Sequence, residues 1–150
     1  MTCVFLRNVT DDNREACLAL TLESHQNAFI PDVATSLEMA AKYVDTRPLV
    51  IYNNKNEVVG FAQYGVDEET GEWKIYRLMI DAAHQGQGLD TATTRELIET
   101  LKTQHSAAAI LLCYHENNQI ARNLYRKFDF QEYGKDGTKI LARLDLIDCK

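Results

Sequence analysis

Apolar residues recur along this chain with two spacings, one typical of strands and one typical of helices. Short apolar or alternating runs bounded by turn residues predict strands, and apolar positions three and four residues apart predict helices. The predicted strands span residues 3–9, 49–52, 58–66, 72–80, 108–114, 130–133 and 139–146. The predicted helices run from the capping segment 10–13 to about residue 26, over 35–44, from the glycines at 86 and 88 to about residue 103, and over 117–128. Arg47-Pro48 is expected to end the second helix, because a residue before proline avoids helical conformation.

The order of these elements predicts the fold class. Antiparallel hairpins come first, and the strand–helix–strand unit over 72–114 then has to pair its two strands in parallel through a crossover. The expected fold is α/β (α+β), with a mixed, mostly antiparallel central sheet and helices on both faces. No linker or repeat interrupts the pattern, so residues 1–150 are expected to form one domain.

Composition excludes several classes of protein. With 45% hydrophobic and 25% charged residues, the chain has the composition of an ordinary globular domain. The net charge of −6 argues against nucleic-acid and anionic-membrane partners and tolerates a cationic one. No apolar run is long enough to span a membrane, and the first residues lack the apolar stretch of a signal peptide, so the cytoplasm is expected.

The cysteines and histidines do not predict a metal site. The four cysteines are scattered without a CxxC motif and are expected to be reduced, with Cys113 inside an apolar run as a core residue. His84 and the His115-Glu116 pair lack a third ligand at a useful spacing, so no metal is expected.

Gly86-Gln87-Gly88, between a predicted strand and a predicted helix, has the composition of an anion-binding turn. Glycines let successive backbone N–H groups point to one place, and the start of a helix adds partial positive charge. The same spacing also occurs in simple tight strand–helix connections. It is not a P-loop, because no Gly-Lys-Ser/Thr follows, nor a dinucleotide fingerprint, because Thr91 stands where the third glycine would fall.

Two segments in this order resemble the GCN5-related N-acetyltransferase (GNAT) family. Residues 77–89, with Gln85, Gly86 and Gly88, are similar to the [QR]-x-x-G-x-[GA] motif that follows a strand, and residues 118–130 are similar to N-x-x-A-x-x-L-Y-x-x-x-G-F. The resemblance covers nearly the whole chain and implies transfer of acetyl from the co-substrate acetyl-CoA to an amine. The implied cofactor-binding residues are Leu78, Met79, Ile80, Gln85, Gly86, Gln87, Gly88, Leu89, Asp90, Asn118 and Ala121.

A looser resemblance points to a substrate class. Residues 26–30, 36–38 and 60–65 are similar to those of small bacterial spermine/spermidine acetyltransferases, which implies a small polyamine as acceptor. Other members of the family act on protein N-termini, lysines or antibiotics. A different class of function is a non-catalytic GNAT-fold sensor or partner module with weakened CoA binding. The oligomeric state stays open, with a homodimer as one alternative.

The resemblance also implies catalytic roles. Tyr125 occupies the Leu-Tyr position and is the candidate general acid for the CoA thiolate, although its helical spacing is equally typical of core packing. The resemblance implies a bulge in the fourth strand around Leu78 and Met79, and the backbone N–H groups there are expected to stabilise the oxyanion. Tyr76 stands where many relatives carry an acidic residue, so no base is inherited, and Glu72 and Glu116 are the candidates.

Acidic residues in the N-terminal helical region are candidates for binding a distal ammonium group of the substrate. These are Glu23, Asp32 and Glu38, with Tyr76 as a further substrate contact. Each acid is equally typical of a solvated surface charge.

Besides Tyr76, two further residues depart from the family pattern. Asp90 replaces the last small residue of the acetyl-CoA motif, where its charge either repels the diphosphate or turns outward and stabilises the helix start. Asp129 replaces the usual glycine after the last helix, a mild change because Asp tolerates the left-handed conformation.

Overall fold

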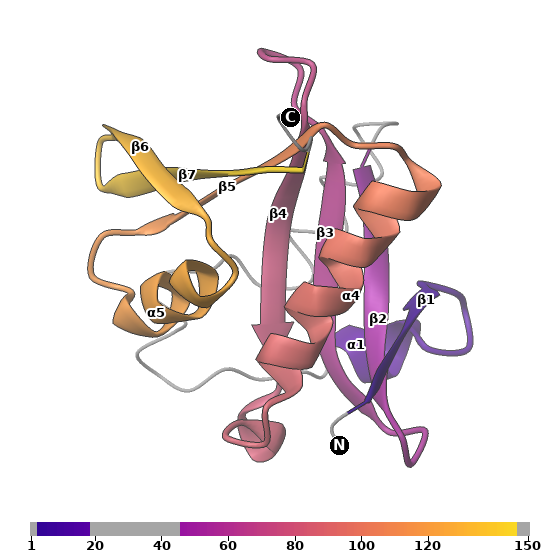
Figure 1. The fold of residues 1–150 in the computed structure, drawn as a ribbon. Coiled ribbons are helices and arrows are strands. Elements are labelled where there is room, and N and C mark those ends of the chain that lie inside the picture. Colours follow the sequence, from indigo (N-terminus) through magenta and orange to yellow (C-terminus); the bar gives the residue numbers. More distant parts are fainter. Residues whose placement is uncertain (1–2, 19–45, 147–150) are drawn as a thin grey trace.

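The computed structural model describes residues 3–18 and 46–146, which form a seven-stranded sheet with helices packed against it (Figure 1). The predicted helix over 35–44 and the last part of the helix before it lie outside these residues. The elements are β1 (Val4–Asn8), α1 (Arg14–Leu18), β2 (Thr46–Asn53), β3 (Val58–Val66), β4 (Trp73–Ile80), the 3₁₀ helix η1 (Ala82–His84), α4 (Leu89–Gln104), β5 (Ala109–His115), α5 (Gln119–Lys127), β6 (Gln131–Asp136) and β7 (Lys139–Asp145).

The sheet confirms the predicted topology. Its strand order is β1-β2-β3-β4-β5-β7-β6, and every neighbouring pair is antiparallel except β4 and β5. The parallel pair is short, because only Trp73 and Lys74 of β4 have partners in β5. Beyond them, β5 turns away from β4 together with β7 and β6, and α5 lies in the angle between the two halves of the sheet (Figure 1).

A bulge in β4 accompanies this divergence. Gln63 of β3 pairs with Arg77, whereas the next residue, Tyr64, pairs with Ile75, so Tyr76 is an extra residue on β4. A bulge bends its strand and increases its twist. It lies just past the last residues that β4 pairs with β5, where the sheet opens.

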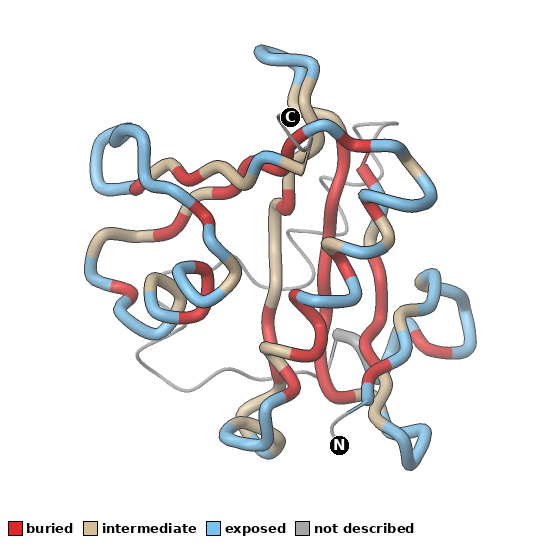
Figure 2. Tube along the Cα trace, in the orientation of Figure 1, coloured by how far each residue is buried: buried red, intermediate tan, exposed pale blue. Residues whose placement is uncertain are grey.

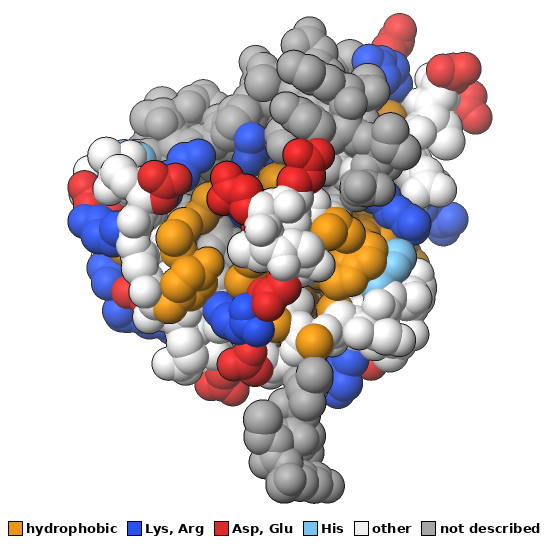
Figure 3. Space-filling view, turned by 90° about the horizontal axis from the view of Figure 1, so that it is seen from above, with side chains coloured by type: hydrophobic (Ala, Val, Ile, Leu, Met, Phe, Trp, Pro, Cys, Tyr) orange, Lys and Arg blue, Asp and Glu red, His pale blue; other side chains and the backbone are white. Residues whose placement is uncertain are grey.

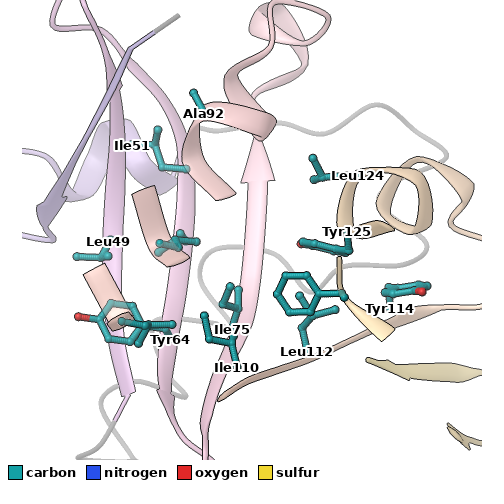
Figure 4. Close-up of a cluster of buried hydrophobic side chains, with 14 of the residues drawn as sticks. Leu49, Ile51, Tyr64, Ile75, Ala92, Ile110, Leu112, Tyr114, Leu124 and Tyr125 are labelled. Carbon is teal, nitrogen blue, oxygen red and sulfur yellow. The ribbon is translucent and has the colours of Figure 1, made fainter. Parts of the chain in front are cut away.

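Hydrophobic residues are buried on both faces of the sheet. In β2, Leu49 and Ile51 belong to the larger cluster, whereas Val50 belongs to a smaller cluster with Phe61 and Met79, as alternation along a strand requires. The larger cluster includes Leu97 and Leu101 of α4, which are fully buried, and residues of α5 (Figures 2 and 4). Burying a leucine contributes about 1.5–3 kcal/mol, so α4 is fixed to the sheet by this stripe. In Figure 1, α4 lies in front of β2 and β3 and α1 behind them.

The two turns that flank α5 hold it in place. Asn118 begins the helix by accepting a hydrogen bond from the Ala121 N–H at 3.2 Å. At the other end Asp129 adopts a φ of 69°, the left-handed conformation expected for it, and the Phe130 N–H donates to the Tyr125 carbonyl. The chain thus turns from α5, which carries Leu124 and Tyr125, into β6 within a few residues.

One predicted element boundary that differs from the structure lies at Pro48. The sequence pattern places the end of a helix there, whereas β2 begins at Thr46 and includes Pro48. The proline is tolerated because β1 pairs with β2 only from Leu49 onward, so Pro48 lies beyond the reach of the outer strand.

The described surface is mixed in charge. Seen from the end that carries the β3–β4 hairpin, Lys and Arg side chains alternate with Asp and Glu side chains around hydrophobic patches (Figure 3). Within residues 3–18 and 46–146, no helix is long and apolar enough to cross a membrane.

Candidate active site

Two neighbouring cavities lie beside the part of β4 that is not paired with β5. The larger has a volume of about 310 Å³ and lies between the end of β4, the start of α4 and α5. The smaller, of about 80 Å³, lies between β4 and β5. Both are lined by Leu78, Asn118, Ala121 and Tyr125, so these four residues stand between the two cavities.

The larger cavity brings together most of the residues that the family motifs imply for cofactor binding. All of them except Gln87 and Gly88 line it. They come from segments far apart in the sequence: Leu78, Met79 and Ile80 from β4, Gln85 and Gly86 from the loop, Leu89 and Asp90 from α4, and Asn118 and Ala121 from α5. The arrangement joins an apolar wall to the first turn of a helix.

The loop before α4 is shaped by two glycines. Gly86 and Gly88 have φ angles of 81° and 78°, a backbone conformation that residues other than glycine rarely adopt. Gly88 is the N-cap of α4, and the Gln85 amide ties the loop back by donating to the Ile80 carbonyl at 2.9 Å. The start of α4 therefore faces the larger cavity, which gives it the geometry of an anion site.

Asp90 lies at the start of this helix and lines the cavity. Its Oδ1 atom accepts a hydrogen bond from the Thr91 N–H at 2.8 Å. The carboxylate is thus hydrogen-bonded to its own helix while the residue lines the cavity, so both expectations for Asp90, repulsion of the diphosphate and support of the helix start, stay predictions.

Three residues that line the larger cavity were not predicted for it: His84, Ile120 and Leu124. The helical spacing predicts Ile120 as a core residue, which is wrong, because half of it is exposed at the cavity. His84 directly precedes the motif that begins at Gln85, and this position could have indicated that His84 lines the same cavity. Helical spacing alone does not distinguish Ile120 from the buried Leu124, although Leu124 occupies the Leu-Tyr position of the family motif.

Tyr125 has the surroundings of a residue that holds a proton. Its ring is buried between Tyr114, stacked at 5.9 Å, and Phe130, edge-on at 5.6 Å, and it reaches from α5 toward β4 (Figure 4). Burial, reinforced by the Asp90 charge, raises the pKa of the phenol well above its ordinary value. Within the described residues its hydroxyl has no hydrogen-bond partner, although a buried tyrosine usually has one, so the hydroxyl is available to a ligand.

The smaller cavity has a different lining on the side of β4 and β5. The Tyr76 hydroxyl donates to the Val66 carbonyl, and an Nη of Arg77 donates to the Tyr76 carbonyl at 2.6 Å. Burial lowers the pKa of the Arg77 guanidinium. Cys113 is a free thiol, half-buried at this cavity rather than in the core as expected.

The two candidate bases lie away from both cavities. Glu72 forms an ion pair with Arg143 of β7, and Glu116 lies 2.5 Å from the Lys135 ammonium, which lowers the pKa of the Glu116 carboxyl. Glu116 lines a separate surface hollow. Glu23, Asp32 and Glu38 lie outside the described residues, and among those described no group of three potential metal ligands occurs.

Comparison with known proteins decides the family. The sequence profile of the Acetyltransferase (GNAT) family matches residues 8–130, most of the chain. The chain belongs to the GNAT acetyltransferase family. It is 33% identical over 147 residues to a spermine/spermidine N(1)-acetyltransferase of Bacillus subtilis, and the match covers 92% of this chain and 96% of that protein.

Solved structures show the same fold at lower identity. The spermidine N-acetyltransferase of Vibrio cholerae, in complex with CoA and spermine, superposes with a TM-score of 0.73 at 15% identity and covers 93% of this chain and 92% of its own. The aminoglycoside acetyltransferase AAC(6')-Ib, in complex with coenzyme A, has a TM-score of 0.78 at 21% identity and covers 95% of both chains. This GNAT acetyltransferase therefore has the expected mixed fold.

Proposed function

We propose that this enzyme transfers the acetyl group of acetyl-CoA to a primary amine of a polyamine such as spermine or spermidine. The observation that carries the transfer is the position of Tyr125, which lines both cavities beside the unpaired part of β4. The polyamine as acceptor is supported by the likeness to the Bacillus subtilis enzyme. The net charge of −6 is compatible with a cationic acceptor.

The lining residues fit the co-substrate. Acetyl-CoA supplies the activated acetyl thioester when bound. The loop 85–88 and the start of α4 would hold its diphosphate through backbone N–H groups, and the wall of Leu78, Ala121 and Leu124 would contact the pantetheine arm. Backbone N–H groups near Leu78 and Met79, on the edge of β4 that β5 leaves unpaired, would face the thioester carbonyl.

Tyr125 would donate its proton to the leaving thiolate. An ordinary thiol has a pKa near 8.5 and a phenol one near 10, so the transfer is modestly uphill. The phenol is protonated at neutral pH even with its ordinary pKa. Burial raises the pKa of Tyr125 further, which by itself makes it a weaker acid, but the same apolar surroundings make the thiolate a stronger base. The proton is therefore present when the thiolate forms.

The acceptor amine has to lose a proton before it attacks. For an amine of pKa near 10.4, this costs about 4.6 kcal/mol at pH 7. We keep Glu72 and Glu116 as candidate bases acting through water, because neither lines the two cavities. A glutamine variant with an unchanged pH–rate profile removes that residue from the candidates.

Calorimetric titration with acetyl-CoA, followed by thiol-release assays, tests the proposal. We expect binding and at least tenfold higher kcat/KM for spermine or spermidine than for lysine peptides, with an aminoglycoside as a third acceptor. Ready acetylation of peptides and none of polyamines would overturn the polyamine assignment alone. Absence of acetyl-CoA binding would overturn the proposed transfer and favour the non-catalytic alternative.

A further inference from the structure

We propose that the Asp90 carboxylate competes with the diphosphate of acetyl-CoA at the start of α4, so that the donor is held mainly through its pantetheine arm. This inference rests on the proposed function, and it names Asp90 as the residue that sets how strongly the charged part of the donor is recognised.

The first observation is the hydrogen bond that Asp90 makes inside the cavity. The first backbone N–H groups of a helix have no partner within the helix, and they are the groups that bind an anion. In α4 the Ala92 N–H makes the first regular intrahelical bond, to the Gly88 carbonyl, so the N–H groups before it lie outside the helical ladder. One of these, the Thr91 N–H, is bound to Asp90 Oδ1 at 2.8 Å. The carboxylate therefore occupies one of the donors with which the helix start could bind a diphosphate oxygen.

The second observation is the charge of the lining. Among the described residues around the larger cavity there is an aspartate, Asp90, and no lysine or arginine. Arg95, the first basic residue along α4, is exposed and lies over the Phe128 ring, with its guanidinium carbon 5.8 Å from the ring centre. A diphosphate here would meet a like charge without a lysine or arginine from the described lining to compensate it, and the basic side chain that does line the cavity is the His84 imidazole.

The other described residues that line the cavity carry no negative charge that would repel the donor. Leu78 and Leu89 are apolar, as are Ile120, Ala121 and Leu124 of α5. Half of Ile120 is exposed at the cavity, so an apolar ligand would cover it. A pantetheine arm without a diphosphate would make these contacts and would not meet Asp90.

Two acetyl donors that share the pantetheine arm, one with the diphosphate and one without it, separate what the arm and the diphosphate each contribute to binding. Calorimetry with acetyl-CoA and with S-acetylpantetheine, which lacks the diphosphate, is performed on the wild-type protein and on Asp90→Asn. Asparagine keeps an oxygen that can accept the Thr91 N–H, so the helix start is preserved while the charge is removed. Glu96→Gln is the control, because Glu96 is exposed on α4 and does not line the cavity. This substitution removes the same charge as Asp90→Asn.

We expect Asp90→Asn to lower the Kd for acetyl-CoA about tenfold at low salt, with a smaller gain at high salt. The Kd for S-acetylpantetheine should change by less than about twofold, as should both values in Glu96→Gln. In the wild type the two donors should differ in Kd by no more than about tenfold.

Three outcomes would overturn the inference. Equal or weaker binding of acetyl-CoA by Asp90→Asn would mean that Asp90 only stabilises α4. Equal gains for both donors, or the same gain in Glu96→Gln, would mean that Asp90 does not act on the diphosphate. If neither donor binds to the wild type or to Asp90→Asn, the proposed function itself fails, and this inference fails with it.

Discussion

The two sides of β4 are built differently. Toward β3, register pairs run along nearly the whole strand, from Trp73 to Ile80, interrupted only by the bulge at Tyr76. Toward β5, pairing ends after Lys74. The same strand therefore belongs to a continuous sheet on one side and borders a cavity on the other. Stability should reside on the paired side and activity on the open side.

Each side has its own means of support. On the paired side the backbones approach so closely at Gly60 that a Cβ atom there would lie 2.3 Å from the Met79 carbonyl oxygen. On the open side, ion pairs and hydrogen bonds between side chains hold β5, β6, β7 and α5 together and tie β7 to the residue before β4. Glu132 of β6 binds Arg122 of α5 and Tyr114 of β5, each at 2.8 Å, and Arg143 binds Glu72 at the closed end of the opening. This difference leads to three predictions.

The largest expected effect is on the open side, at Tyr125. Tyr125→Phe keeps the buried ring and removes the hydroxyl proposed as the general acid, so kcat should fall about 10²–10⁴-fold with the thermal midpoint nearly unchanged. Steady-state kinetics and thermal unfolding of the same preparation provide the two readouts. An unchanged kcat would make Tyr125 a packing residue.

The second prediction concerns the paired side, at Gly60. Gly60→Ala forces a methyl group against the Met79 carbonyl and should lower the free energy of unfolding by about 2–3 kcal/mol. Gly134→Ala is the matched control, because a Cβ atom there would lie 3.9 Å from its nearest neighbour, Leu141, and should change stability by less than about 0.5 kcal/mol. Urea unfolding measures both. Equal stability of the two variants would contradict the idea that close backbone approach holds β3 to β4.

The smallest expected effect is on the brace at Glu132. The hydrogen bonds from Arg122 and Tyr114 lower the pKa of this carboxyl to about 2, below the value of about 4.3 in the unfolded chain. Its stabilisation is therefore present above about pH 5 and is lost as the pH falls toward 2.

Glu132→Gln should thus lower the free energy of unfolding at pH 7 by about 1 kcal/mol, the range of a well-oriented surface ion pair. The difference from the wild type should disappear near pH 2. Urea unfolding across this pH range measures it, with Glu99→Gln, an exposed acid on α4, as the control. A difference that persists at low pH would mean that glutamine disturbs packing rather than charge.

Local patterns predicted the elements well, because the signals that form them lie within each segment. The strand over 58–66 agrees with β3, and Asp129 adopts the predicted left-handed conformation. The sequence pattern was misleading at Pro48, which was expected to end a helix but lies in β2. The strand tolerates this proline because β1 pairs with β2 only from Leu49 onward. The bulge at Tyr76 and the short β4–β5 pairing had no local signal, because they arise from how strands fit together across the sheet.

The candidate site was predicted to the extent that two motifs carry it. Segments 77–90 and 118–125 are far apart in sequence, and the family resemblance grouped them before the fold placed them around one cavity. The motifs did not indicate which side chains of a helix are exposed and which are buried. Ile120 and Leu124 have the same helical spacing, yet one is half-exposed and the other buried. Nor could the sequence reveal that Glu72 and Glu116 are each bound to a cation.

The unpaired edge of β4 also has a consequence for isotope exchange. Beyond Lys74, successive N–H groups of β4 alternate between β3 and the opening. Those toward β3 should exchange with deuterium only when the sheet unfolds, whereas those toward the opening should exchange through small local fluctuations. A ligand seated in the opening would slow only the second set. The exchange pattern of a single strand can thus report occupancy of the site in the absence of turnover.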